Sequence, residues 1–142
     1  MKATDTGLYT ILNTDSGSAM GTISGSLNNL GVTGVYRMVA PQTAALPYVV
    51  FSEQSGVSEW EFDKRYAKSL LYLVKAVGSG HSGSAASAAS DRFDVLLNDQ
   101  PLTLTGWTCV RLRREQDVEY VEESEGVIYQ HVGGLYRVDV IP

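Results

Sequence analysis

The stretch YAKSLLYLVKAV, residues 66–77, decides the fold class of this chain. Its apolar residues fill both alternating sets of positions, Leu70, Tyr72, Val74 and Ala76 on one face and Leu71, Leu73 and Val77 on the other. Successive side chains of a strand point to opposite faces, so a strand with this pattern needs cover on both. We therefore predict a central strand with other elements packed on each face.

Upstream of this stretch, two segments also have strand character. Tyr48–Ser52 is β-branched and aromatic, and Trp60–Phe62 alternates apolar with charged residues. Ser55–Gly56 lies between them and favours a turn, which predicts two antiparallel strands joined there. Still earlier, Val35–Val39 predicts a strand, and the two prolines of the segment from Pro41 to Pro47 predict a loop.

Downstream, residues 82–98 predict the main helix. Apolar residues recur at helical spacing, and the helix is expected to end at Asn98 with Pro101 just beyond it. The positions that carry this pattern are Ala85, Ala89, Phe93, Leu96 and Leu97. Before the helix, Ser79 or Ser82 is the expected N-cap.

The last part of the chain predicts a long hairpin. Trp107 to Tyr120 and Val127 to Ile141 are β-rich, and the acidic segment Glu122–Gly126 separates them. In the return strand, Tyr136, Val138 and Val140 alternate with Arg137 and Asp139, the pattern of a half-buried strand. Gly133–Gly134 predicts a bulge or kink in that strand.

The first third, residues 1–34, is polar and rich in loops. Asp5 or Thr6 is expected to cap a short helix that carries Leu8, Ile11 and Leu12 on one face. A second short helix is expected to hold Ile23, Leu27 and Leu30. Together these elements predict one α+β domain spanning residues 1–142. Its antiparallel sheet, with the long C-terminal hairpin, packs against one main helix at about residues 82–98, and short N-terminal helices precede it.

Length and composition exclude several classes of protein. The chain has 142 residues, of which 44% are hydrophobic, enough for one core without disulfides or metals. Its longest apolar run is Leu70–Val74, and its N-terminus leads into no apolar signal segment, so we expect a soluble protein. Cys109 is the single cysteine and is expected in the core. The net charge of −5 disfavours coating of nucleic acid.

The segment from Gly78 to Gly83, GSGHSG, matches the G-x-G-x-x-G pattern of dinucleotide-binding turns and lies between a strand and a helix. That pattern needs a βαβ unit with parallel strands, whereas a hairpin follows here. We interpret it as a turn before the helix. A small nucleotide-binding enzyme that uses residues 78–83 remains an alternative.

The residues point to no catalytic, metal or cofactor site. Nucleophilic catalysis requires a base, and the two histidines, His81 and His131, lie in a glycine- and serine-rich loop and in a strand. Carboxylates crowd the acidic turn, but they lack the alternate spacing and the intervening glycine of oxygen-ligand cation loops. We predict no enzyme activity.

Charged residues of the C-terminal hairpin are instead the candidate interface with a second copy or a partner. We expect the arginines and the nearby carboxylates to pair across strands or across subunit boundaries, and the tip to contact a neighbour or face a channel. The candidate residues are Arg111, Arg113, Arg114, Glu115, Asp117, Glu119, Glu122, Glu123 and Glu125. Replacing Arg113 and Arg114 with Glu is then expected to prevent assembly and leave the monomer folded.

The order of elements resembles the tail completion or tail terminator (tail-to-head joining) proteins of long-tailed bacteriophages. The segments that carry the resemblance are Pro47–Phe51, Glu59–Phe62, Lys64–Tyr66 leading into Ser69–Val74, the helix with Phe93 and Leu96–Leu97, and Tyr136–Val140. Two regions depart from the family pattern: Thr14–Gly34 is longer and more polar, and the acidic turn has no counterpart.

The resemblance implies a structural virion protein that acts as a closed ring, usually a hexamer, at the head-proximal end of the tail tube. There it would stop polymerisation of the tube and offer a surface for joining the head. The implied partners are further copies of the chain, the tail tube protein and a neck or head completion protein. DNA would pass through the lumen, and no membrane is involved. Assembly would take place in the host cytoplasm. A neck or head–tail connector adaptor is the alternative within this class.

Overall fold

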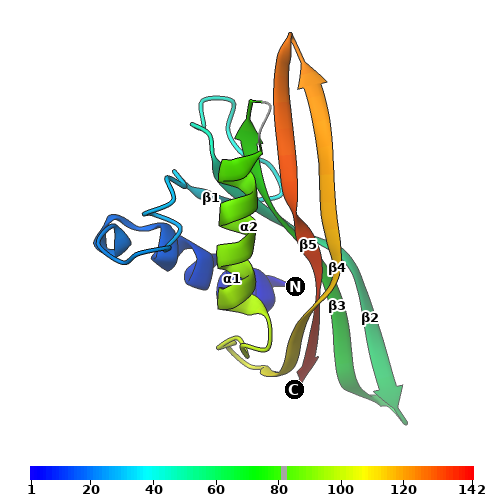
Figure 1. The fold of residues 1–142 in the computed structure, drawn as a ribbon. Helices are drawn as coiled ribbons and strands as arrows, with labels where there is room; N and C mark the ends of the chain where they lie inside the picture. The colour runs from blue at the N-terminus through cyan, green and yellow to red at the C-terminus, as the bar shows by residue number, and fades with distance from the viewer. Residues whose placement is uncertain (81–82) are drawn as a thin grey trace.

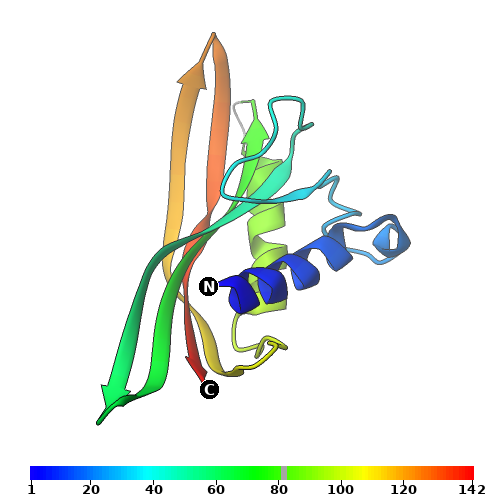
Figure 2. The same ribbon diagram turned by 180° about the vertical axis from the view of Figure 1, so that it is seen from behind.

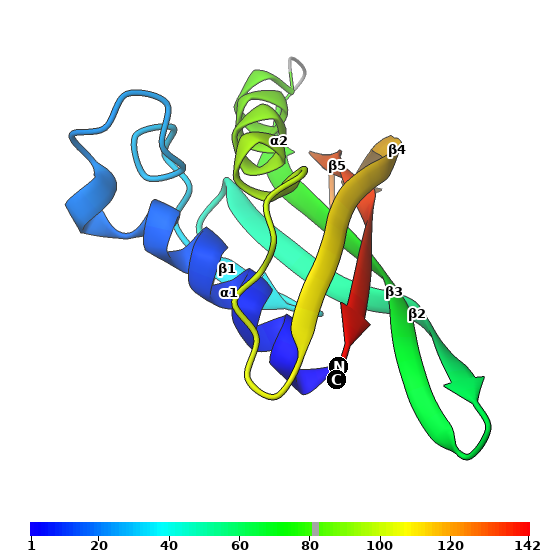
Figure 3. The ribbon, with the colours of Figure 1, turned by 90° about the horizontal axis from the view of Figure 1, so that it is seen from below.

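Five strands form one sheet in the computed structural model, which describes residues 1–80 and 83–142. From edge to edge the order is β1 (Val35–Arg37), β2 (Tyr48–Glu61), β3 (Lys64–Ser79), β5 (Val127–Ile141) and β4 (Thr108–Ser124). All neighbouring strands are antiparallel except β1 and β2, which are parallel. Helices α1 (Lys2–Ser16) and α2 (Ser84–Leu97) pack on one face of the sheet (Figure 1 and Figure 3). The predicted α+β class is confirmed.

Strand β3 is the central strand, as predicted. Its side chains Leu70, Tyr72, Val74 and Ala76 are fully buried on the face that the helices cover, which we call the helix-side face. The expectation of cover on both faces is met at one end of β3 alone: α1 and α2 both lie on one side (Figure 2), and on the opposite side Val77 is buried near the loop at residues 40–46. On the other face, which we call the open face, Leu71 and Leu73 are half-buried.

Helix α2 covers the middle of the helix-side face and confirms the predicted main helix. Its residues Ala86, Ala89, Phe93 and Leu97 are buried against the sheet, and the Phe93 ring meets Tyr136 of β5 edge-on. The expected serine cap is wrong for Ser79, which ends β3, because Gly83 in the left-handed region is the N-cap. Ser82 and His81 lie outside the described residues.

Helix α1 is longer than expected and begins earlier. It spans 15 residues from Lys2, and Met1 is its N-cap, so Asp5 and Thr6 cap nothing. Asp5 instead lies inside the helix and is buried, and its carboxylate accepts hydrogen bonds from side chains of two strands. Tyr72 of β3 donates a hydrogen bond of 2.7 Å to Asp5 Oδ1, and Arg37 of β1 donates one of 2.9 Å to Oδ2.

The second N-terminal helix is not formed. Residues 18–20 make a single 3-10 turn, and hydrogen-bonded turns continue to Val32. Leu27 reaches the core, but Ile23 is exposed. The reason is Asp15, whose carboxylate accepts the Leu27 amide at 2.8 Å and the Arg92 guanidinium at 2.7 and 2.9 Å. Although burial raises the pKa of Asp15, these hydrogen bonds lower it overall.

Strand β2 is one continuous strand, so the predicted turn at Ser55–Gly56 is wrong. The chain reverses later, at residues 62–63. A register shift between Glu53 and Ser55 marks a bulge at Gln54, and the strand continues beyond it. A serine and a glycine that favour a turn are here accommodated next to a bulge. Strand β1 is confirmed but ends at Arg37, since Met38 has φ 67°.

The predicted C-terminal hairpin is confirmed, and β4 and β5 pair along almost their whole length. Glu125 and Gly126, both with positive φ, form the turn. The bulge expected at Gly133–Gly134 is wrong, because β5 is regular there. The register instead shifts in the facing strand, between Arg114 and Gln116. Gly133 is needed for another reason, since a Cβ there would overlap the Val74 carbonyl and lie 2.6 Å from Lys75 Cα.

We expect the substitution Gly133→Ala to lower the free energy of unfolding by about 3 kcal/mol, because backbone atoms of β3 cannot move aside from the new methyl group. Gly56→Ala is the matched control. A Cβ there would meet only the ends of the flexible Glu53 and Leu70 side chains, so the expected loss is about 1 kcal/mol or less. Urea denaturation measures both losses, and equal values would contradict the close approach of β5 to β3.

Candidate functional site: two hairpin arms

Two hairpins project beyond the helices from opposite ends of the sheet (Figure 1 and Figure 2). One is the outer part of the β4–β5 hairpin, residues 115–131, which we call the acidic arm. The other is the outer part of the β2–β3 hairpin, residues 57–68, which we call the aromatic arm. Because these segments extend past the covered part of the sheet, they are the surfaces most available to a partner.

The acidic arm contains the negative net charge of the chain. It has six carboxylates and no lysine or arginine, whereas the remaining residues carry ten acidic and all eleven basic side chains. The six are Glu115, Asp117, Glu119, Glu122, Glu123 and Glu125. Glu119, Glu123 and Glu125 form no ion pair with any described residue. The arm is therefore a strongly negative projection on a nearly neutral body.

The carboxylates near the base of the acidic arm have partners within the chain. Glu115 is bound by Arg137 of β5 at 3.0 and 3.1 Å, and these hydrogen bonds lower the pKa of the Glu115 carboxyl. Asp117 lies 2.8 Å from Arg114. The predicted pairing of Glu115 and Asp117 across subunits stays a prediction, but both already have a cation inside this chain.

The three arginines of β4 also have partners within the chain, and they differ in burial. Arg111 binds Asp139 at 2.8 Å, and Arg113 lies 3.5 Å from Asp99 with both side chains exposed. Arg114 is instead mostly buried on the helix-side face. The pairing of Arg111 and Arg113 with a neighbouring subunit stays a prediction.

Arg114 holds β4 against α2 and β5. It donates to the Gly133 carbonyl and to Tyr136 Oη, and it lies 3.5 Å from Asp94 of α2. Burial lowers the pKa of Arg114, but the nearby Tyr136 hydroxyl and the carboxylates of Asp94 and Asp117 raise it overall. Arg114→Glu would place a carboxylate among these groups, so Arg113 is the better position for a test of assembly.

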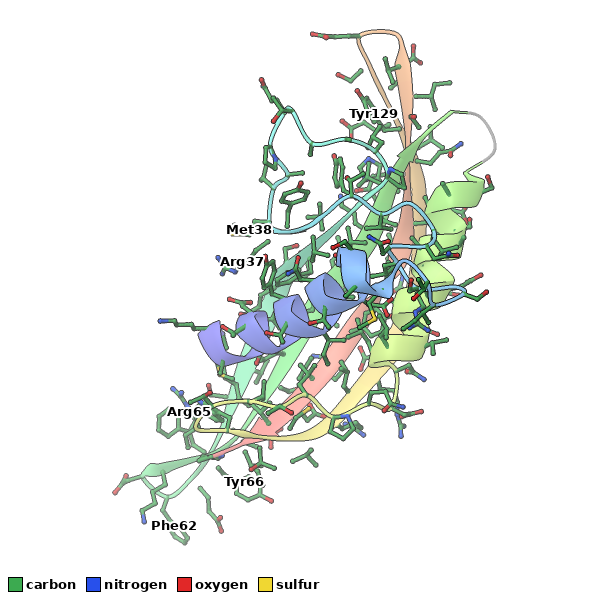
Figure 4. All side chains as sticks on the ribbon, turned by 90° about the vertical axis from the view of Figure 1, so that its left-hand side faces the viewer. Arg37, Met38, Phe62, Arg65, Tyr66 and Tyr129 are labelled. Atoms are coloured by element: carbon green, nitrogen blue, oxygen red, sulfur yellow. The ribbon has the colours of Figure 1, made fainter. Side chains whose placement is uncertain are left out.

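The aromatic arm carries large apolar side chains in solvent. Trp60 is 61% exposed, Tyr66 is 59% exposed and Phe62, at the turn, is 97% exposed. The Arg65 guanidinium lies 5.2 Å from the centre of the Trp60 ring, in cation–π contact. Figure 4 shows Phe62, Arg65 and Tyr66 at the end of this arm, at the opposite end of the molecule from Tyr129. Clustered exposed aromatic residues of this kind mark interaction sites.

Beside the acidic arm, the open face of the sheet is hollowed. The hollow has a volume of about 610 Å³ and lies between the loop at residues 40–46 and the ends of β3, β4 and β5. Glu122 and Glu125 supply its negative charge, and Pro41, Leu46, Tyr48 and Tyr129 supply apolar surface. It can accommodate a side chain that is both apolar and cationic.

His131 forms part of the wall of this hollow and is buried. Its ring stacks on Tyr120, 4.4 Å between ring centres, and its Nε2 lies 3.2 Å from Glu122. Lys75 donates a 2.7 Å hydrogen bond to the Tyr120 hydroxyl. Burial, together with the charge of Lys75, lowers the pKa of His131 despite the nearby Glu122. The ring is therefore neutral at neutral pH.

The glycine-rich segment is not in the setting of a dinucleotide site. β3, which precedes it, is antiparallel to both of its neighbours, β2 and β5, whereas that site requires parallel strands. Within residues 1–80 and 83–142, no group of three His, Cys, Asp or Glu side chains is placed to hold a metal ion. No helix in the same part of the chain has the length and hydrophobicity to span a membrane.

Two features of the site were missed at the level of sequence. The strand pattern predicts the ends of two strands at the aromatic arm and no exposed cluster. The signal that could have identified an exposed tip is the seven-residue segment 60–66, in which three aromatic residues, Trp60, Phe62 and Tyr66, surround Lys64 and Arg65. The hollow could not be found, because it depends on a loop before β2 lying beside residues more than 70 positions later.

We expect Arg114→Met to lower the free energy of unfolding by about 2 kcal/mol, because the substitution removes a mostly buried guanidinium together with its hydrogen bonds to Gly133 and Tyr136. The neighbouring Arg113→Met removes an exposed pair and is expected to cost less than about 0.5 kcal/mol. Urea denaturation of the two variants measures the difference. Equal losses would show that Arg114 does not hold β4 to α2.

We expect His131 to make the fold less stable as the pH falls. In the unfolded chain a histidine binds a proton near pH 6.5, and the lowered pKa means that the folded chain binds it less readily. The free energy of unfolding should therefore fall from about pH 7.5 to about pH 5.5, and fall less in His131→Gln. Thermal denaturation across this range tests the point, and parallel curves for the two proteins would contradict it.

Comparison with known proteins finds similarity in fold. No protein-family model matches the sequence, and no curated protein matches it significantly. A chain of the virion of a native gene transfer agent (GTA) particle is similar over 99% of this chain and 96% of its own, with 18% identity and a TM-score of 0.71. A second solved protein, which carries no functional description, matches 96% of this chain and 91% of its own, with 14% identity and a TM-score of 0.54. At these low identities, the structural similarity shows a shared fold and nothing further.

Proposed function

We propose that this chain is a structural virion protein that forms a ring on the end of a phage-type tail tube, stops its polymerisation and provides the surface for joining the head. The observation that carries the proposal is the fold, shared over almost the whole length with a chain of a GTA virion. The order of strands and helices that suggested tail terminator proteins is present in the structure.

The shape of the molecule supports assembly into a ring. Its two arms differ in chemistry and point in opposite directions (Figure 1). A contact between two unlike surfaces of identical subunits is head-to-tail, and such contacts close into rings when the rotation between subunits permits. The ring of the proposal is a hexamer, as in the family that the sequence resembles.

The charge distribution supports passage of DNA through such a ring. An acidic surface repels the phosphate backbone, so a lumen lined by carboxylates does not retain DNA as it moves. In the proposal the tail tube protein binds one side of the ring and a neck or head completion protein binds the other. The chain performs no reaction. It is assembled in the host cytoplasm and stays at the head-proximal end of the tail.

Inactivating the gene in the element that encodes it tests the proposal, with electron microscopy of the particles as the measurement. We expect tubes of uncontrolled length that fail to join heads, because nothing stops polymerisation. Restoring the gene in trans is the control and should restore normal tails. Tubes of normal length left unjoined would instead assign the chain to the neck, and normal joined particles would overturn the proposal.

A further inference from the structure

The tip of the aromatic arm has features of a binding surface that lacks its partner. Phe62 is almost completely exposed at the turn, and Trp60 and Tyr66 are more than half exposed beside it. Removing aromatic side chains from water is favourable in proportion to the apolar area buried, so leaving several of them exposed forgoes that stabilisation. Such a cluster at the end of a projecting hairpin indicates a contact with another molecule.

The charged side chains of this tip also lack ion-pair partners. Lys64, Arg65 and Lys68 form no ion pair with any residue that the structure describes, and neither do Glu59, Glu61 and Asp63. The chain's other six arginines each form one: Arg37, Arg92, Arg111, Arg113, Arg114 and Arg137. The contrast sets Arg65 apart from the arginines of the body, each of which is neutralised locally.

Alternation along the two strands sorts these charges onto different faces. A register shift lies between Glu59 and Trp60, and beyond it Trp60 pairs directly with Arg65, so these two stacked side chains share one face. Glu59 and Glu61, the neighbours of Trp60 on β2, point to the other face. Asp63 lies at the turn beside Phe62, so the tip as a whole is neutral, while Trp60 and Arg65 make one of its faces aromatic and cationic.

The hollow beside the acidic arm has the complementary chemistry. Glu122 and Glu125 face it, and Pro41, Leu46, Tyr48 and Tyr129 line it. The tip of the aromatic arm and this hollow lie at opposite ends of the same molecule, as Phe62 and Tyr129 in Figure 4 show. One molecule cannot join them, but two copies can.

We propose that the tip of the aromatic arm of one copy binds the acidic hollow of the next copy, with Phe62 against its apolar wall and Arg65 against Glu122 and Glu125. The contact is heterologous, so each copy uses its tip toward one neighbour and its hollow toward the other. This inference rests on the proposed function, because it names the contact between subunits of the ring.

Charge exchange tests the contact. We expect Arg65→Glu alone and Glu125→Arg alone each to weaken self-association about 100-fold, because each places like charges together. The double variant Arg65→Glu/Glu125→Arg restores opposite charges and is expected to recover association to within about fivefold of the unchanged protein. Sedimentation velocity over a concentration series gives the association constants, and circular dichroism verifies that each variant is folded.

Two further variants control for net charge. Lys2→Glu on α1 produces the same change in net charge as Arg65→Glu. Asp91→Arg on α2 produces the same change as Glu125→Arg. Lys2 and Asp91 are both exposed and lie outside the proposed contact. We expect neither to change association more than about twofold. Phe62→Ser removes the apolar part of the tip and is expected to weaken association about 20-fold.

Several outcomes would overturn the contact. They are single variants that associate like the unchanged protein, a double variant that is not restored, or an unchanged protein that is monomeric up to about 1 mM. The last two would indicate that the tip binds another virion protein. Failure here is separable from failure of the proposed function: gene inactivation that yields unterminated tubes upholds the ring even if charge exchange fails. Conversely, restored association with normal tails upholds the contact alone.

Discussion

The hydrogen bond from the Tyr72 hydroxyl to the Asp5 carboxylate joins the centre of the sheet to the start of the chain. Burial is the main cause that raises the pKa of Tyr72, and the nearby Asp5 carboxylate raises it further. The hydroxyl therefore keeps its proton and donates the hydrogen bond. Asp5 in turn accepts from Arg37, which brings β1 to the same point. One buried carboxylate therefore positions helix α1, edge strand β1 and central strand β3 relative to one another. The packing of Leu8 and Leu12 depends on that placement.

Sequence patterns predicted the elements whose side chains repeat at a fixed spacing. The alternation from Leu70 to Ala76 identified the central strand, and the spacing of Ala89, Phe93 and Leu97 identified α2. Features that depend on contacts between distant segments were not predicted. Asp5 appeared to be a cap because its partner Tyr72 lies 67 residues away. Ser55–Gly56 appeared to be a turn, because a bulge in the middle of a strand has the same local composition as a turn.

The candidate site illustrates the same limit. The charged residues of β4 could be named from sequence, but a bulge between Arg114 and Gln116 changes which face later residues occupy. Arg113 and Arg114, which precede this bulge, differ because successive side chains of a strand point to opposite faces: Arg113 is exposed and Arg114 is buried beside Asp94. The projection of the two hairpins beyond the helices was also hidden, because it depends on how far the helices cover the sheet (Figure 1).

Strand β4, of 17 residues, is an outer strand of the sheet, and residues 98 and 99 cover the middle of its outer edge. The Asp99 amide donates to the Leu112 carbonyl, and the Arg114 amide donates to Asn98 Oδ1. A long outer strand invites the addition of further strands and growth of fibrils. The two register shifts of β4, near Val110 and Glu115, interrupt that template, and its charged side chains disfavour close stacking. These features disfavour the joining of copies of this protein through the edges of their sheets.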